Sequence, residues 1–214
     1  MSRDDVANRV AARYPTRFLR GYVRSKIRTD PVYGAVFERL RDTGQPVFDV
    51  GCGIGILPLY LRERGFTAPI CGVDHDERKI AIARSVVPDA DLHTGDARTA
   101  IDRGGTIVLL DLLHYFTSEE QARMLAEVAA RATTVIIRDA IRDGSWRYRV
   151  TYGQEMFSRV VRWLRADRLH FPDRDAVTQP FAGFDMEVMP LYARTPFNNY
   201  LFVFRRSLAG TTNE

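Results

Sequence analysis

The stretch VFDVGCGIGILPLYL, residues 47–61, constrains the fold of this chain more than any other segment. Its first four residues predict a short buried strand, and the apolar run at its end predicts the start of a helix. Gly51, Gly53 and Gly55 stand on alternate positions between the two elements. Glycine allows a sharp turn and the close approach of a ligand, and the N-terminus of a helix offers unpaired N–H groups. The stretch therefore predicts a strand–loop–helix unit that binds a ligand.

Strands and helices are expected to alternate along most of the chain. Continuous apolar segments predict strands at residues 47–50, 70–73, 91–94, 106–110 and 133–138. Segments with helical spacing separate them, at residues 57–64, 77–85 and 118–131. Ser118 is expected to cap the last of these helices. This alternation indicates a parallel sheet covered on both faces. Residues 185–192 and 200–206 predict two final strands, which a short link would pair antiparallel.

The segment before the first expected strand predicts helices. Residues 4–28 have helical spacing that is interrupted at Pro15, with an apolar side and a row of four arginines within residues 17–28. Asp30 is followed by a proline, which predicts the N-terminus of another helix that extends to about Leu40. An arginine row on a helix is most simply a solvated face.

The expected organisation is a helical cap, a main α/β domain and a lid. We expect the cap at residues 1–45, the main domain at residues 46–214 and a lid insertion at about residues 140–172. The lid segment is rich in arginine and aromatic residues, and part of it has helical spacing. Aromatic side chains of this segment that could line a pocket are Trp146, Tyr148, Tyr152, Phe157, Trp163 and Phe171. Packing of the lid against the sheet is the alternative explanation for each of them.

Acidic residues occur at the ends of the first three expected strands. Asp49 precedes Gly51 by two positions, and Asp74 ends the second strand. At that position an acidic side chain can accept hydrogen bonds from both ribose hydroxyls of a bound cofactor. Asp96, in the sequence TGDA, follows the third strand and could reach an adenine amino group. The order and spacing of these residues indicate a site for an adenosine-containing cofactor.

In this order of motifs the chain resembles the class I S-adenosylmethionine-dependent methyltransferases, over residues 46–206. The resemblance implies a Rossmann-like, doubly wound α/β sheet of seven strands, mostly parallel with an antiparallel last strand, and a helical lid. It implies S-adenosyl-L-methionine as the cofactor and S-adenosyl-L-homocysteine as the product. The cofactor-binding residues that it implies are Asp49, Gly51, Cys52, Gly53, Gly55, Asp74, His75, Asp96, Ala97, Asp111 and Leu112.

The resemblance also implies a role for each group of these residues. The glycines would lie beneath the methionine and ribose parts of the cofactor, and Asp49 would help to hold its amino end. Asp74 would bind the ribose, with His75 or Asp76 beside the adenine. Asp96 and Ala97 would meet the adenine edge.

The segment after the fourth strand would face the reaction. The resemblance implies that Asp111, Leu112 and His114 face the methyl donor and the acceptor. A nicotinamide-dependent oxidoreductase is the main enzymatic alternative. Ile56 argues against it, because it stands where the dinucleotide fingerprint G-x-G-x-x-G has its third glycine. A doubly wound fold that binds another nucleotide, or no ligand, is a further alternative.

The residues that are missing narrow the class of acceptor. The ribose 2′-O methyltransferases need lysines around the site, and no lysine follows Lys79. The sequence DLLHYF, residues 111–116, lacks the Asn- or Asp-Pro-Pro-aromatic motif of amino-group methyltransferases, and it lacks a cysteine for attack on a pyrimidine. Asp111 and Asp139 could form a magnesium site only if a further ligand stood at Ala140, so we expect no metal.

After these acceptor classes are set aside, a small aromatic or phenolic acceptor fits the sequence best. The methyl group would go to oxygen or to a ring carbon. A methyltransferase of RNA or protein and a non-catalytic cofactor-binding module are the alternatives. Candidate catalytic residues are His114, Tyr115 and His170. His114 follows the fourth strand, and an imidazole is the side chain best suited to proton transfer near neutral pH. The alternative for His114 is a loop cap that bonds to backbone. Alignment of the reactants alone could also suffice.

Charge and further sequence segments bear on partners. The net charge of +4 is too modest to require nucleic acid. The segments DLLHYF, RDAIRDGSWRYR and RTPFNNYLFVF also resemble a bacterial methyltransferase group associated with aryl-polyene-type pigment pathways, which implies secondary metabolism and a phenolic acceptor. An acyl carrier protein could present that acceptor, and arginines within residues 17–28 and 159–165 could then bind the acidic carrier. The chain shows no apolar signal region or membrane span, so we expect it in the cytoplasm.

Overall fold

The fold is organised around a seven-stranded sheet with the predicted mixture of strand directions. The computed structural model describes residues 2–160, 169–192 and 195–207. The strands are β1 (Val47–Val50), β2 (Ile70–Asp74), β3 (Asp91–Thr94), β4 (Gly105–Leu110), β5 (Ala132–Ala140), β6 (Phe184–Pro190) and β7 (Asn199–Arg206). Their order is β3-β2-β1-β4-β5-β7-β6, and the first five are parallel. β7 runs antiparallel to both of its neighbours, which confirms the predicted fold class.

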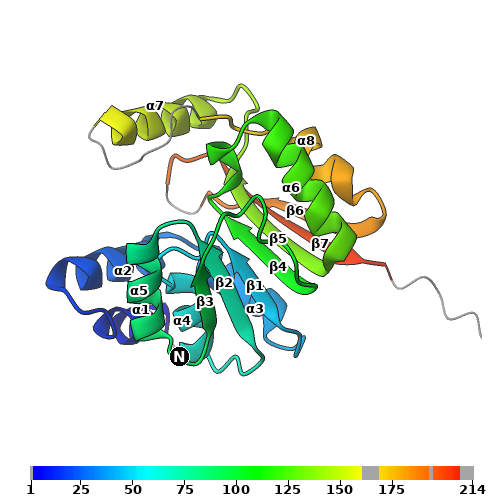
Figure 1. Cartoon of the computed structure of the whole chain (residues 1–214). Helices are drawn as coiled ribbons and strands as arrows, with labels where there is room; N and C mark the ends of the chain where they lie inside the picture. Colours follow the sequence, from blue (N-terminus) through cyan, green and yellow to red (C-terminus); the bar gives the residue numbers. More distant parts are fainter. Residues whose placement is uncertain (1, 161–168, 193–194, 208–214) are drawn as a thin grey trace, which may run out of the picture.

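Helices cover both faces of this sheet (Figure 1). The helices are α1 (Arg3–Ala12), α2 (Arg17–Thr29), α3 (Val32–Leu40), α4 (Ile56–Glu63), α5 (Glu77–Val86), α6 (Ser118–Arg131), α7 (Trp146–Val160) and α8 (Arg174–Thr178). Two short 3₁₀ turns are η1 (Leu113–Tyr115) and η2 (Gln179–Phe181). Apolar residues of α1 to α5 share one core with one face of the sheet, and those of α6, α8 and η2 share the second core with the other face.

The central strands explain why both faces are covered. In β4, Val108 belongs to the first core, whereas Ile107 and Leu109 on either side of it belong to the second. Because successive side chains of a strand point to opposite faces, a strand that is apolar throughout must be buried on both. The three N-terminal helices share the first core with α4, so they are packed into the body of the protein.

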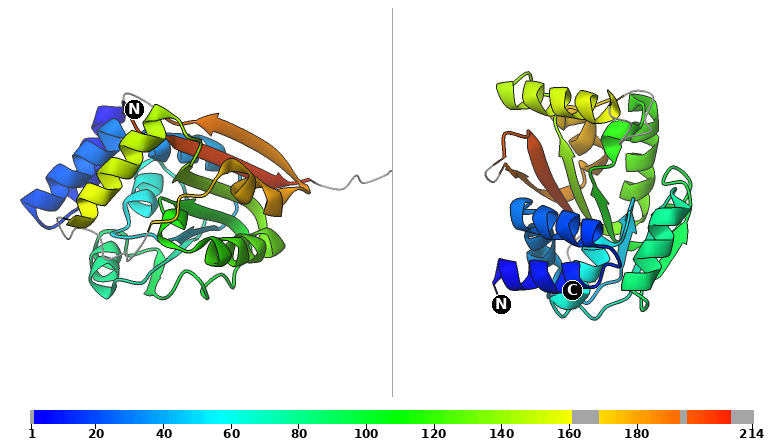
Figure 2. Two further views of the ribbon diagram at one scale, coloured as in Figure 1. Left: turned by 90° about the horizontal axis from the view of Figure 1, so that it is seen from above. Right: turned by 90° about the vertical axis from the view of Figure 1, so that its left-hand side faces the viewer.

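α7 stands apart from the helices that cover the two faces of the sheet. It follows β5 and lies beyond the carboxyl end of that strand (Figure 1). In the right-hand view of Figure 2, α7 lies opposite α2, and the carboxyl edge of the parallel strands is between them. No helix in the described ranges is long and apolar enough to cross a membrane.

Two predicted helix starts are corrected by the structure. Ser118 is the first residue of α6 and does not cap it; Thr117 is the cap, and its side chain and that of Glu120 bond to each other's backbone N–H groups. This reciprocal arrangement satisfies two N–H groups that a helix start leaves open. The second helix is predicted to start with the proline after Asp30, but α3 begins one residue later, at Val32. The Asp30 carboxylate still accepts a hydrogen bond from the Val32 N–H.

Candidate active site

A large cleft opens at the carboxyl edge of the parallel strands, between α2 and α7. Its volume is about 1580 Å³. A pocket for one small ligand usually measures about 300–1000 Å³, so this cleft has room for two ligands side by side. Ten of the residues predicted to bind the cofactor line it, namely Asp49, Gly51, Cys52, Gly53, Asp74, His75, Asp96, Ala97, Asp111 and Leu112. The three predicted catalytic residues, His114, Tyr115 and His170, line it as well.

The glycine loop forms part of the floor of this cleft. Gly51 and Gly53 have φ angles of 83° and 55°, in the region that favours glycine. A Cβ atom on Gly51 would lie 2.9 Å from the Cδ1 atom of Leu112. The N–H groups of Gly51 and Cys52 both donate to the carbonyl oxygen of Val73, which fixes the loop to the end of β2. The loop is therefore a rigid surface that no larger side chain at position 51 could form.

Gly55 contacts a neighbouring helix at the start of α4. It is not among the residues that line the cleft, although it also has a positive φ, of 79°. A Cβ atom on Gly55 would lie 3.1 Å from the Cβ atom of Ala83 in α5. Gly55 is thus needed where the start of α4 packs closely against α5.

Two acidic residues stand at the ends of β1 and β2. Asp49 is buried, and burial together with the nearby Asp74 carboxylate raises its pKa to about 7. Asp74 accepts hydrogen bonds from the Gly53 N–H at 3.0 Å and from the Asp76 N–H at 2.9 Å. These bonds orient the Asp74 carboxylate beside the loop. A cationic ligand above the loop would stabilise the ionised form of Asp49.

The nucleoside end of the cleft, as the sequence predicts it, contains an ion-pair network. The Asp96 carboxylate accepts bonds from the Arg98 side chain, the shortest of them 2.6 Å, and these bonds lower its pKa. Arg98 also pairs with Glu120 of α6 at 2.9 Å. His75 is exposed beside Asp74. The Asp96 side chain is therefore held in one orientation at the edge of the cleft.

His114 lines the cleft and forms a buried polar pair with Asp139, which is not among the lining residues. Nδ1 of His114 lies 2.6 Å from Oδ1 of Asp139, and the two residues are 4% and 0% exposed. The second oxygen of Asp139 accepts the N–H groups of Leu113 and His114, at 2.8 and 3.4 Å. The alternative role predicted for His114 is a loop cap that bonds to backbone. Its Nδ1 atom instead bonds to the side chain of Asp139.

A second set of bonds fixes the position of the His114 segment. The His170 N–H donates to the His114 carbonyl oxygen at 2.9 Å. The side-chain amide of Gln121, on α6, donates to the carbonyl oxygens of Leu113, Phe116 and His170. His170 thus contributes its backbone to the position of His114.

The aromatic wall of the cleft differs from the predicted one. Phe171 stacks on the His114 ring, with centroids 5.3 Å apart and planes 17° apart, and it lines the cleft. The other lid aromatics whose side chains the structure describes do not line it, and Trp146 is 61% exposed. The Phe157 side chain and Trp163 lie outside the described residues. Aromatic residues that line the cleft without having been predicted are Phe18, Tyr22, Tyr33, Phe116 and Phe197.

Asp111 lies in a charged cluster at the wall formed by the N-terminal helices. Its φ is 54°, and among the described residues no other non-glycine residue has a positive φ. Its carboxylate pairs with Arg138 of β5 and, at 3.6 Å, with Lys26 of α2. Sequence reasoning missed Lys26 and Arg138, and considered Asp139 only as a metal ligand. Within the described ranges, no group of three or more His, Cys, Asp or Glu side chains could hold a metal ion.

Residues 47–133 match the family model of the methyltransferase domain. The match covers less than half of the chain. The matched segment starts with β1 and contains the glycine loop, Asp74, Asp96 and His114. The match supports the predicted enzyme class, a methyltransferase. A comparison with curated proteins gave no match.

The chain also shares its fold with solved structures. The magnesium protoporphyrin IX methyltransferase ChlM from Synechocystis PCC 6803, with bound SAH, superposes with a TM-score of 0.67 at 19% identity, over 95% of this chain and 93% of that chain. The pyocyanin biosynthetic protein PhzM gives 0.65 at 18% identity, over 93% and 61%. PH0226 from Pyrococcus horikoshii OT3 gives 0.61 at 18% identity, over 86% and 91%. At these identities the likeness concerns the fold.

Proposed function

We propose that this protein is an S-adenosylmethionine-dependent methyltransferase with a small aromatic acceptor. The methyl group would go to a phenolic oxygen or to the adjacent ring carbon. The observation that carries the proposal is the buried pair of His114 and Asp139, of which His114 lines the cleft. A phenol must lose its proton as it becomes a nucleophile, and an imidazole oriented by a carboxylate suits that task. Phe171, stacked on the imidazole, provides a flat surface for an acceptor ring.

The residues of the cleft fit the methyl donor. The glycine loop offers a surface without side chains, and its Gly51 and Gly53 would lie beneath the methionine and ribose. Asp74 would accept the ribose hydroxyls and Asp96 would meet the adenine edge, while Asp49 would place negative charge near the amino end. When bound, S-adenosylmethionine supplies an electrophilic methyl group on a sulfonium and leaves as S-adenosylhomocysteine.

His114 would act as the general base for the acceptor. With its Nδ1–H donated to Asp139, the imidazole takes the phenolic proton at Nε2, and the carboxylate stabilises the imidazolium that forms. Loss of that proton would make the phenolic oxygen, and the ring carbon that it activates, the nucleophile toward the methyl group that the donor would supply. The proton then passes from His114 to water, which restores the neutral base.

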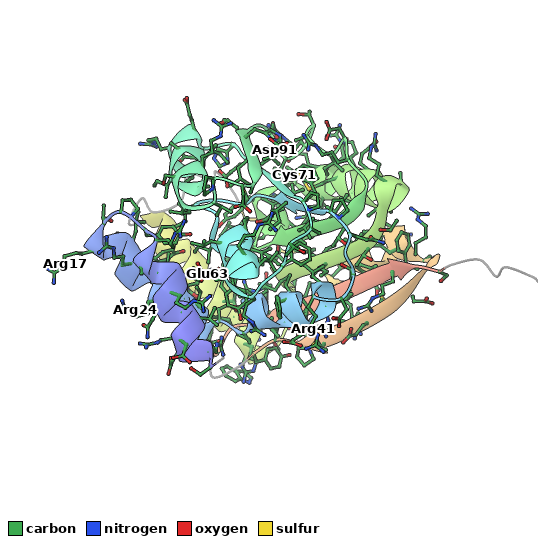
Figure 3. The ribbon with its side chains drawn as sticks, turned by 90° about the horizontal axis from the view of Figure 1, so that it is seen from below. Arg17, Arg24, Arg41, Glu63, Cys71 and Asp91 are labelled. Atoms are coloured by element: carbon green, nitrogen blue, oxygen red, sulfur yellow. The ribbon has the colours of Figure 1, made fainter. Side chains whose placement is uncertain are left out.

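The proposal has a finer form in which an acyl carrier protein presents the acceptor. α2 lines the cleft with Phe18 and Tyr22, and it exposes the arginines at positions 17, 20 and 28. Arg17 points away from the body of the molecule (Figure 3). An acidic carrier bound to this helix would stand beside the opening. The second expected arginine row lies largely outside the described residues. Cytoplasmic location and a role in aryl-polyene-type secondary metabolism belong to this form of the proposal.

The test is transfer of a labelled methyl group from S-adenosylmethionine into an extract of the host cell. The extract is separated into solvent-extractable, carrier-protein, general protein and RNA fractions. We expect label on a solvent-extractable aromatic compound or on a small acidic carrier. The variant His114→Ala should lower the rate of labelling, and His93→Ala serves as the matched control, because His93 lies in β3 outside the lining of the cleft.

Two results would contradict the proposed acceptor. Label that is confined to RNA or to general protein would identify a polymer as the acceptor. Binding of the donor without transfer of label to any fraction, including added phenols, would indicate a cofactor-binding module without catalysis. Equal rates for His114→Ala and His93→Ala would remove His114 from the reaction.

A further inference from the structure

Four charged side chains meet where the N-terminal helices touch the carboxyl edge of the sheet. Lys26 comes from the last turn of α2, Asp30 from the link between α2 and α3, Asp111 from the end of β4 and Arg138 from β5. All four line the cleft. Two positive and two negative groups alternate in this cluster, so it is neutral as a whole.

One half of the cluster is fixed and buried. The Arg138 side chain is 6% exposed, and its two terminal nitrogens pair separately with Asp30 and Asp111. Asp30 is fixed in turn by the Val32 N–H at 3.1 Å. Nε of Arg138 has no hydrogen-bond acceptor in the part of the chain that the structure describes. Arg138 therefore acts as a buried support that sets the position of both carboxylates.

The other half of the cluster is open to the cleft. The side chains of Lys26 and Asp111 are 30% and 32% exposed. Nζ of Lys26 lies 3.6 Å from Asp111 and 4.0 Å from Asp30, whereas a hydrogen bond between an ammonium and a carboxylate is about 2.7–2.9 Å long. Lys26 thus forms no short bond with either acid, and its donors can turn to a ligand. The positive φ of Asp111 is a local cost of the kind found at ligand sites.

We infer that Lys26 and Asp111 bind the two charges at the amino-acid end of the methyl donor. Lys26 would bind the carboxylate, and Asp111, supported by Arg138, would bind the ammonium. A neutral cluster with alternating charges matches a zwitterion better than it matches a purely anionic group. Asp111 is also next to the glycine loop, because its neighbour Leu112 packs on Gly51.

This inference rests on the proposed placement of the donor on the glycine loop. It adds that the donor site is completed from outside residues 47–133, by a residue of the N-terminal helices and one of β5. The N-terminal segment would then be part of the cofactor site as well as a wall of the acceptor site.

The test compares three probes by titration calorimetry on the full chain. S-adenosylmethionine carries both charges, decarboxylated S-adenosylmethionine lacks the carboxylate, and 5′-methylthioadenosine lacks the whole amino-acid end. Lys26→Ala should weaken binding of S-adenosylmethionine by about tenfold or more, the value of a hydrogen bond between charged groups. Binding of the other two probes should be unchanged. Asp111→Asn should weaken both probes that carry the ammonium and leave 5′-methylthioadenosine unchanged.

Lys79→Ala is the matched control, because Lys79 also lines the cleft but lies on α5. It should leave the ratio of affinities among the three probes unchanged. If Lys26→Ala weakens all three probes equally, or none, the inference is wrong while the donor site stands. A rise in the acceptor KM without loss of donor affinity would assign Lys26 to the acceptor. If the wild-type protein binds neither S-adenosylmethionine nor 5′-methylthioadenosine, the proposed donor site itself is wrong.

Discussion

The nucleoside end and the acceptor end of the cleft are assembled in different ways. The first comes from β1, β2 and β3 and the loops after them, and the bond that joins Gly53 to Asp74 spans 21 residues. The second includes the place where the amino-acid end of the donor would meet the acceptor. It joins Lys26, Asp111, His114 and Asp139, and its contact between Arg138 and Asp30 spans 108 residues. Consecutive strand–loop–helix units can build a site from local sequence, whereas the acceptor end exists only after the whole chain has folded.

The largest expected effect is at the acceptor end. His114→Ala should lower kcat by about 10²–10⁴-fold, the usual contribution of a general base, because it removes the group that takes the proton. The affinity for S-adenosylmethionine should stay within about twofold, since His114 would not hold the donor. Steady-state kinetics and calorimetry on the same preparation would check both. A matching loss of donor affinity would show that the two ends are not separable.

A second prediction concerns the glycine loop at the nucleoside end. Gly51→Ala should lower donor affinity by about 10–100-fold, because the new Cβ atom must push Leu112 aside and the positive φ costs about 1–3 kcal/mol. Gly55→Ala should lower the free energy of unfolding by crowding Ala83, with a smaller effect on donor affinity. Gly21→Ala, in an open position of α2, is the control and should stabilise the protein slightly. Equal losses of donor affinity for Gly51→Ala and Gly55→Ala would contradict the two roles.

A third prediction concerns pH and Asp49. The pKa of its carboxyl group is raised to about 7 in the ligand-free protein, and a cationic donor favours the ionised form. Donor affinity should therefore fall as the pH drops below about 7, by up to tenfold per pH unit, and Asp49→Asn should remove this dependence.

In the ligand-free protein the raised pKa of Asp49 favours the protonated folded state. The contribution of Asp49 to stability is thus present below about pH 4 and lost as the pH rises to about 7. A pH-independent affinity in the wild type would contradict this account of Asp49.

The smallest expected effect is at the lid. Trp146→Ala should change the acceptor KM by less than about twofold, because Trp146 is mostly exposed and does not line the cleft. Phe171→Leu should raise that KM by about 3–10-fold, since it removes the ring that stacks on His114. KM values for one acceptor would decide between them. An equal rise for both variants would place the predicted lid pocket around Trp146 after all.

The contrast between the two ends also explains what could be predicted from the sequence. The succession of strands and helices, the glycine loop and the acids after β1, β2 and β3 follow from apolar periodicity and from residues that are close in sequence. The spacing of Gly55 fits the loop and predicts contact with the cofactor, whereas its packing against Ala83 can be seen only in the structure. Spacing identifies that a glycine is needed but not which atom approaches it.

The acceptor end could be predicted only in part. His114 was recognisable from its position after the fourth strand, but its partner Asp139 was not, because the register of β4 against β5 decides which acid meets it. Lys26 carried no signal in a segment dominated by arginine. The aromatic lining came from α2 and from residue 197 as well as from the segment after β5, since aromatic content alone does not tell which side chains face a cleft.

The most direct test of the central claim uses acceptor phenols of graded acidity. Wild type and His114→Ala are assayed at one pH with a phenol that is neutral at that pH and with a more acidic one that is already ionised. If His114 takes the phenolic proton, its removal should cost about 10²–10⁴-fold with the neutral phenol and little with the ionised phenol. The same loss with both phenols would contradict the assignment and leave His114 as a group that only shapes the cleft.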